Sequence, residues 1–345
     1  MTSSRTLSRF IRPVIAAWLA LGAGSASAEL VAKLPQVMNP FHLAIADGRM
    51  YIVEDSVAVH IYKLDANGAA FVKTFGREGQ GPGEFDFIYS VRPFKDHLDV
   101  PGSHKLARFS PDGDYLSEVP VTVGVFKGAA FRLGDGYVVR DLNFDEKGMT
   151  TTIRLYDKDF KLVKDVGART SAGGLDKINL VSDYYSVRVA GDRLYVIDAS
   201  QDSVVTILDR NGALQKEVHL PLAPFRMTDE LKAAIIKPVK DSWDRTMRWE
   251  DYEKRLFFPS QAPGLDHFEV SDGRFIVRTY KYSGDKVEFV LFDEGGRELQ
   301  RQYLPFTGRL SNGLLFCFYQ GRYYYLRENA EEEVWELHAE TAWRP

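Results

Sequence analysis

A unit of short strands separated by tight turns recurs along this 345-residue chain, and it constrains the fold more than any other feature. Its first copy has turns at Asp47-Gly48 and Asn67-Gly68, with strand-like runs at 49–53, 60–64 and 71–75. Asp-Gly and Asn-Gly between apolar runs are typical of β-hairpins. The sequence therefore predicts repeated antiparallel sheets.

Further copies follow at a regular spacing. The turns of the second hairpin in successive copies, at Asn67, Asp112, Asp159 and Asn211, lie 45, 47 and 52 residues apart. Two more copies have first turns at 272–273 and 320–321. A repeat of about 40 to 50 residues with four strands is typical of a propeller blade. Six copies predict an all-β fold, a six-bladed β-propeller of four-stranded blades.

The two ends of the repeat array are expected to meet. The last copy shows three strands, while the strand-like segment 29–37 has no partner in the first copy. We expect this segment to supply the fourth strand of the last blade and so to cover an exposed sheet edge. The alternative is a loose N-terminal arm.

A helical insertion, residues 225–264, is predicted between blades 4 and 5. Thr228 is placed to cap a helix that begins with acidic residues, and Pro238 is expected to end or kink it. A second helical run is expected from Trp243 to Leu256. We consider two roles equally: a lid over one mouth of the channel, or a cap packed on a blade.

The first 28 residues have the pattern of a secretory signal peptide. Arg5, Arg9 and Arg12 precede a short apolar run, and Ala26-Ser27-Ala28 resembles a cleavage site. No cysteine lies near that site, so a lipid anchor is not expected. We therefore expect a periplasmic or secreted protein whose single domain spans residues 29–345.

Charge and cysteine content limit the partners. The formal net charge is −4, and it becomes −7 once the three leader arginines are removed. Such a chain has no electrostatic attraction for nucleic acid or anionic membranes. Because Cys317 is the only cysteine, an intramolecular disulfide is impossible, and a buried inert thiol is expected. No stretch approaches the ~20 apolar residues of a membrane span, and we expect a monomer.

The glycine-rich segment 75–85, FGREGQGPGEF, carries a family resemblance. It resembles NHL-type propellers, especially the secreted bacterial "6-bladed beta-propeller" group, in which GQGPGEF follows a strand. The pattern from Asp47 to Asp55 is similar to the NHL repeat core. This resemblance implies the propeller fold, which hosts binding platforms, lyases, lactonases and scaffolds. We interpret 76–85 as the crossover from blade 1 to an innermost strand that begins near Tyr89, with Glu84 bonded to its own turn.

Candidate site residues follow from this fold. In propellers, sites form at one channel mouth, where the innermost strands begin and in the loops after the second strands. The candidates are His42, Glu54, Asp55, Tyr89, Arg140, Asp141, Tyr185, Asp198, His267, Arg278 and Arg327. Guanidinium groups bind carboxylates through paired hydrogen bonds. The alternative is structural, with carboxylates tying loops to backbone amides. Two further strand starts are expected at 128–129 and 311–312.

Catalytic and metal-binding signatures are missing from the sequence. It has no His-Glu-x-x-His pattern, no Gly-x-Ser-x-Gly elbow and no P-loop. We expect no metal or other cofactor, with a divalent cation in the channel as an open alternative. The leading hypothesis is a non-catalytic platform that binds a polar ligand, peptide or glycan. The alternatives are a hydrolase or lyase that uses His42 and His267, and a scaffold for an envelope protein.

Overall fold

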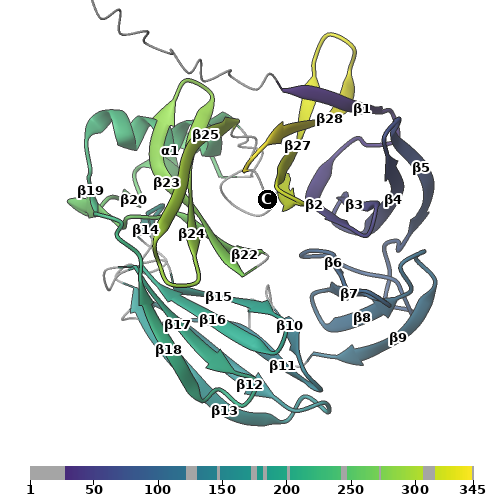
Figure 1. Ribbon diagram of the computed structural model, residues 1–345, viewed down its shortest axis with the longest axis horizontal. Coiled ribbons are helices and arrows are strands. Elements are labelled where there is room, and N and C mark those ends of the chain that lie inside the picture. Colours follow the sequence, from purple (N-terminus) through teal and green to yellow (C-terminus); the bar gives the residue numbers. More distant parts are fainter. Residues whose placement is uncertain are drawn as a thin grey trace, which may run out of the picture.

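The computed structural model describes residues 28–121, 130–145, 148–171, 177–181, 185–199, 203–241, 247–271, 273–305 and 315–343. Residues 1–27 of the expected signal peptide and the strand starts expected at 128–129 and 311–312 lie outside these ranges. Within them, six four-stranded antiparallel sheets are arranged as blades around one axis (Figure 1). The predicted six-bladed propeller is confirmed.

Blades 1 to 5 each use four strands in chain order, from the axis to the rim. Blade 1 has β2 (Pro40–Ala46), β3 (Arg49–Glu54), β4 (Ala58–Asp65) and β5 (Gly68–Phe75). Blade 2 has β6 (Arg92–Pro93), β7 (Leu98–Pro101), β8 (Lys105–Phe109) and β9 (Tyr115–Pro120). Blade 3 has β10 (Ala130–Leu133), β11 (Gly136–Asp145), β12 (Gly148–Tyr156) and β13 (Leu162–Ser171). Blade 4 has β15 (Tyr185–Ala190), β16 (Arg193–Asp198), β17 (Val204–Asp209) and β18 (Leu214–His219). Blade 5 has β22 (His267–Ser271), β23 (Arg274–Ser283), β24 (Lys286–Asp293) and β25 (Glu298–Pro305).

Blade 6 joins the two ends of the described chain. It consists of β26 (Phe316–Tyr319), β27 (Arg322–Asn329), β28 (Val334–Thr341) and β1 (Glu29–Leu34), and β1 pairs antiparallel with β28 at the rim. The N-terminal segment therefore closes the ring, as the unpartnered run predicted. The strand stops at Leu34 rather than Val37, because the chain turns there with the Val37 N–H bonded to the Leu34 carbonyl at 3.0 Å.

The first hairpin of blade 1 shows why these segments fold as they do. Asp47 and Gly48 have φ of 47° and 70°, and two positive φ values give the turn that matches the right-handed twist of the flanking strands. The following strand, β3, is buried from Met50 to Glu54. It has apolar residues on both faces because each blade is covered by a neighbour on either side.

The hydrophobic core is divided among the six interfaces between adjacent blades, each of which holds its own cluster of buried apolar residues. Between blades 1 and 2, for example, the rings of Phe75 and Phe109 have centroids 4.3 Å apart. Between blades 4 and 5, Tyr195 meets Phe275 edge to face at 6.0 Å. Apolar contacts between adjacent blades therefore hold the ring together.

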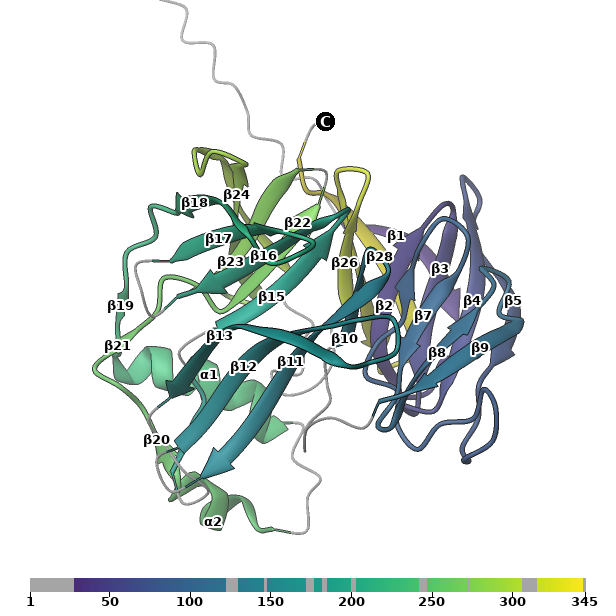
Figure 2. The same cartoon turned by 90° about the horizontal axis from the view of Figure 1, so that it is seen from below.

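The insertion contains β19 (Phe225–Arg226), α1 (Asp229–Asp241), α2 (Trp249–Glu253), β20 (Leu256–Phe257) and β21 (Gln261–Ala262). β19 pairs with β21, and β20 pairs with β14 (Ile178–Asn179). The insertion lies at the end of the ring where the innermost strands begin (Figure 2). No described helix is both long and apolar enough to cross a membrane.

Helix α1 packs on blade 5. The Thr228 hydroxyl accepts a hydrogen bond from the Leu231 N–H at 3.2 Å, which is the predicted cap. Ile235 of α1 is buried in a cluster with Val181 and with Tyr280 of β23. The helix continues beyond Pro238, contrary to one expectation, because buried residues on either side of the proline anchor it. Of the second helical run, Trp243 lies outside the described residues, and α2 ends at Glu253 rather than Leu256, because Leu256 begins β20.

Candidate functional site

Two of the predicted carboxylates hold the loop that precedes β2. Glu54 is 6% exposed, and its Oε1 accepts hydrogen bonds from the backbone N–H groups of Met38 (2.9 Å) and Asn39 (2.6 Å). Asp55 accepts a hydrogen bond from the side-chain amide of Asn39 at 3.0 Å. Both carboxylates therefore have structural partners.

Asp141 and Asp198 pair with arginines of blade 3. Arg154 donates hydrogen bonds to Asp141, and Arg169 Nε donates one to Asp198 at 2.7 Å. Asp198 is therefore bonded to a guanidinium. Tyr185 lies beside this pair, and its pKa is raised by burial and then by the charge of Asp198.

Three predicted arginines lie inside strands rather than in loops. Arg140, Arg278 and Arg327 belong to β11, β23 and β27, which continue past these residues to Asp145, Ser283 and Asn329. Arg278 Nε donates to Asp266 Oδ1 at 2.7 Å, and both side chains are buried. Arg327 is exposed. Tyr89 precedes β6, and its ring packs on a neighbouring phenylalanine with centroids 4.9 Å apart.

The innermost strands of the blades have equivalent residues at the same height along the axis, and we call this height the shared level. Blades 1, 3, 4, 5 and 6 close their first hairpin with a two-residue turn, so equivalent positions can be counted back from it. The residues two positions before the end of these hairpin strands are Ala44, Phe131, Arg188, Glu269 and Cys317. Blade 2 has a longer hairpin, but Tyr89–Arg92 repeats the Tyr-Ser-Val-Arg of Tyr185–Arg188. Arg92 is therefore the blade 2 member of this level.

Charged side chains at this level bridge neighbouring blades. Arg188 Nε donates to Glu269 Oε2 at 3.1 Å, and Arg188 also donates to the Ser186 hydroxyl at 3.1 Å. His267 Nε2 lies 2.9 Å from Glu269 Oε1. His42 of β2 and Arg92 of β6 are near enough for Glu269 to affect both of their pKa values. We call His42, Arg92, Arg188, His267 and Glu269 the axial cluster.

The protonation states of the axial cluster follow from its charges. Burial alone would raise the pKa of Glu269, but the charge of Arg188 and the adjacent His267 outweigh it and lower that pKa to about 2. Burial lowers the pKa of His267. Burial and then the charge of Arg92 lower the pKa of His42 to about 4. At neutral pH, Glu269 is therefore ionised and both histidines are neutral.

Arg92 has a different environment from Arg188. It donates a hydrogen bond to the Ala130 carbonyl, and its guanidinium lies 3.7 Å from the centroid of the Phe131 ring. Burial and then the charge of Arg188 lower its pKa to about 9, so it remains protonated at neutral pH. Within the described part of the chain, no carboxylate forms an ion pair with it.

The remaining chemistry near the axis is limited. Burial raises the pKa of the Cys317 thiol, so it stays protonated and is not a ready nucleophile. Among the described residues, no three histidine, cysteine or acidic side chains gather in an arrangement that could hold a metal ion. The axial cluster offers hydrogen-bond donors, one carboxylate and two guanidinium groups.

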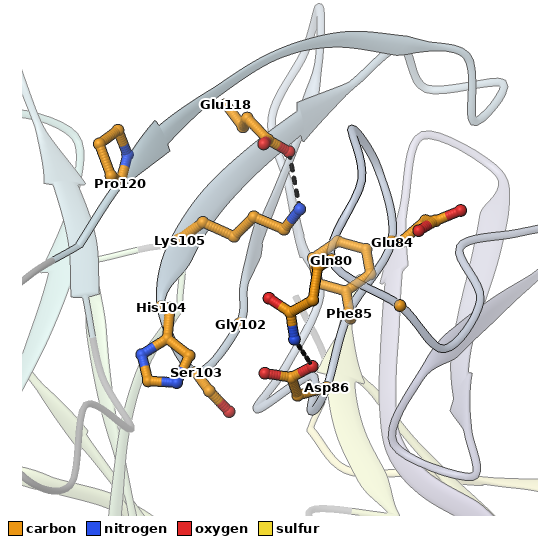
Figure 3. Close-up of a pocket in the computed structure, with 11 residues that line it drawn as sticks. Gln80, Glu84, Phe85, Asp86, Gly102, Ser103, His104, Lys105, Glu118 and Pro120 are labelled. Carbon is orange, nitrogen blue, oxygen red and sulfur yellow. Dashed lines mark hydrogen bonds and ion pairs between the residues drawn. The ribbon is translucent and has the colours of Figure 1, made fainter.

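A second candidate, away from the axis, is a pocket of about 410 Å³ beside the glycine-rich crossover (Figure 3). Four of its polar side chains are paired with one another. Lys105 Nζ donates to Glu118 Oε2 at 2.9 Å, and Gln80 donates to Asp86. None of the residues that line it has a buried side-chain atom without a partner. Its local pairing makes the pocket a weaker candidate than the axial cluster.

The crossover itself has the structural role that the sequence predicted. Glu84 Oε2 accepts a hydrogen bond from the Gly81 N–H at 2.9 Å, so this carboxylate is bonded to its own turn. A Cβ atom at Gly79 would overlap the Glu84 carboxylate, which explains why glycine is needed there. The next innermost strand begins at Arg92, slightly later than the expected start near Tyr89.

Sequence reasoning missed three members of the axial cluster: Arg92, Arg188 and Glu269. It considered the first residues of each innermost strand and so found His42 and His267. The available signals were the repeated Tyr-Ser-Val-Arg and the charged residues enclosed by apolar ones in the middle of short strands. A charge in such a position faces either a partner or the axis.

No family model matches this chain, and no curated protein matches it in sequence. The solved structures that match it include the AfRom2 CNH domain, with a TM-score of 0.44 and 9% identity over 92% of this chain and 100% of that one. The Neurospora crassa Pan2 WD40 domain has a TM-score of 0.42 and 7% identity over 91% and 95%. Apo AztD from Citrobacter koseri has a TM-score of 0.33 and 11% identity over 52% and 47%. The fold assignment therefore rests on the sheet topology, and the NHL-type resemblance stays a prediction.

Proposed function

We propose that the protein is an exported binding platform that takes a small polar ligand over the axial cluster. The main support for this proposal is that five ionisable side chains from blades 1, 2, 4 and 5 lie close together around the axis. Burying charged groups costs free energy that an apolar contact would not. The ring already has apolar contacts at every interface, so its stability does not explain this cluster. The side chain of Glu269 is 29% exposed, so solvent reaches the cluster.

Export is part of the proposal, and it is supported by the basic leader, the short apolar run and Ala26-Ser27-Ala28. Mass spectrometry of protein recovered from the periplasm of an expressing bacterium should show a chain that begins at Glu29. Recovery of the uncleaved chain from the cytoplasm would contradict export and leave the binding proposal to its own test.

A hydrolase or lyase is the second candidate, because one observation favours it. His267 Nε2 lies 2.9 Å from Glu269 Oε1, as in a general base oriented by a carboxylate. His42, the other predicted acid or base, has no hydrogen bond to a carboxylate among the described residues. The binding platform is therefore preferred. A scaffold for an envelope protein is the third candidate, since propellers commonly present interaction surfaces.

Binding is tested by thermal shift and calorimetry on the purified mature chain, with glucose, glucuronate, alanylalanine, succinate, Ca²⁺ and Mg²⁺ as probes. At least one probe should raise the melting temperature, and the double variant R188Q/E269Q should weaken its binding at least tenfold. The matched control is K105Q/E118Q, which removes an ion pair from the crossover pocket and should bind normally. If the control loses binding instead, the site is the pocket. If no probe binds, the platform proposal fails and the scaffold is favoured.

A further inference from the structure

We propose, resting on the proposed function, that the ligand presents a carboxylate to the axial cluster and that Arg92, assisted by His42, binds it. Two guanidinium groups are available at this level. Arg188 is already held by Glu269 at 3.1 Å. Arg92 forms no ion pair with any described carboxylate, so its charge is available to a ligand.

Among the described residues, Arg92 is held in place by contacts that leave most of its donors unused. One N–H group is bonded to the Ala130 carbonyl, and the guanidinium carbon lies over the Phe131 ring, 3.7 Å from its centroid. Stacking on an aromatic face fixes the orientation of a guanidinium without using its N–H donors. A guanidinium has five such donors in a fork that matches the two oxygens of a carboxylate. Arg92 is therefore preorganised for that group.

His42 supplies a second unused group. Its Nδ1 is buried and has no hydrogen-bond partner among the described residues. Buried polar atoms in proteins are nearly always paired, so an unpaired one indicates an interaction that is completed by water or a ligand. His42 is neutral at neutral pH, because burial and the charge of Arg92 lower its pKa. One of its ring nitrogens can therefore donate to a ligand oxygen.

The charge balance favours a single negative charge. Arg92 and Arg188 carry two positive charges, Glu269 carries one negative charge, and the histidines are neutral. Asp99, which lies near Arg92, is committed to Arg108 at 3.1 Å. The axial cluster therefore has a net charge of one positive unit. One carboxylate would neutralise it, whereas a phosphate dianion would add an unmatched charge.

The test is calorimetric titration with matched acid and neutral probes: glucuronate against glucose, and alanylalanine against alanylalanine amide. For at least one pair, the acid should bind at least tenfold more tightly than its neutral partner. R92Q should remove that preference by lowering the affinity for the acid to about that for its neutral partner. R92K should retain part of the preference, because an ammonium keeps the charge but lacks the fork. A single cooperative melting transition within a few degrees of that of the wild type would show that R92Q is folded.

The outcomes separate this inference from the proposed function. If both members of each pair bind equally and R188Q/E269Q abolishes that binding, the platform stands and the carboxylate inference fails. If R92Q keeps the preference for the acid, Arg92 is not the anion-binding residue. Orthophosphate binding more tightly than either acid would overturn the choice of a carboxylate. If none of the probes binds, the proposed function itself is overturned.

Discussion

Blades 2 and 4 share the sequence Tyr-Ser-Val-Arg near the axis, at Tyr89–Arg92 and Tyr185–Arg188. The two arginines nevertheless have different partners. In blade 4, Arg188 Nε donates to Glu269 at 3.1 Å. In blade 2, Arg92 lies 3.7 Å from the Phe131 ring centroid and has no carboxylate partner within the described ranges. The next blade decides the difference, since blade 5 places a carboxylate at the shared level and blade 3 places an aromatic ring there.

The two serines differ in the same way. The Ser186 hydroxyl accepts a hydrogen bond from Arg188 at 3.1 Å, whereas Ser90 Oγ is buried without a partner among the described atoms. The repeat thus determines the position of a side chain in the fold, and the neighbouring blade determines which partners that side chain has. One arginine serves the structure of the ring, and its counterpart is left for another role.

The largest expected effect is a difference in the free energy of unfolding between a variant that removes the partner of Arg188 and a variant of the unpaired Arg92. E269Q leaves Arg188 partly buried without its counter-charge, so the free energy of unfolding should fall by about 2 to 3 kcal/mol. R92Q breaks no ion pair, but it removes a charged donor to the Ala130 carbonyl and the contact with the Phe131 ring, so it should lower that free energy by a smaller amount, about 1 kcal/mol. Urea unfolding at pH 7 measures both changes.

A double-mutant cycle makes this comparison stricter. R188Q, E269Q and the double variant should show a coupling of at least about 1 kcal/mol. The matched cycle of R92Q with E269Q should show a clearly smaller coupling, because no hydrogen bond joins those two side chains. Equal coupling in the two cycles would mean that the distinction between the arginines is wrong.

Turn chemistry explains why the fold could be predicted from sequence. Turns such as Asp47-Gly48 and Asn67-Gly68 require particular local backbone angles, so they mark the blades without knowledge of any neighbour. Strand lengths could not be predicted in this way. Arg140 and Arg278 lie inside strands that continue to Asp145 and Ser283, and the length of such a strand depends on its pairing with a neighbouring strand.

The candidate site was predicted in part for the same reason. His42 and His267 stand at strand starts, which the repeat locates. Arg188 and Glu269 were missed, because their contact joins residues 81 positions apart in different blades. Most of the predicted carboxylates proved to be bonded to nearby loops or arginines. No single blade contains the information that would distinguish these roles.

The next largest expected effect is a dependence of stability on pH, which arises from His42, the histidine near the unpaired Arg92. The folded protein lowers the pKa of His42 from 6.5 to about 4, so between these values the unfolded state binds more protons. Stability should therefore fall as the pH is lowered from 6.5 towards 4, and His42 should contribute about 2 kcal/mol of that loss at pH 5.

H42Q should lose less stability than the wild type between pH 7 and pH 5, as measured by urea unfolding at each pH. NMR of the wild type should show that the His42 ring does not titrate above about pH 5. His267, whose pKa is also lowered, will retain part of the acid sensitivity in H42Q. Titration of His42 near pH 6.5 would show that its ring is less buried, or Arg92 further away, than the structure indicates.

The smallest effect tests the two serines against each other. S186A removes a hydrogen bond to a charged group and should lower the free energy of unfolding by about 1 to 2 kcal/mol. S90A removes a buried hydroxyl that has no described partner, so stability should stay within about 0.5 kcal/mol or rise. Because both serines are buried and precede the same Val-Arg pair, each variant is the control for the other. Equal losses would indicate that Ser90 has a partner after all, and with it that Arg92 is less free than its surroundings suggest.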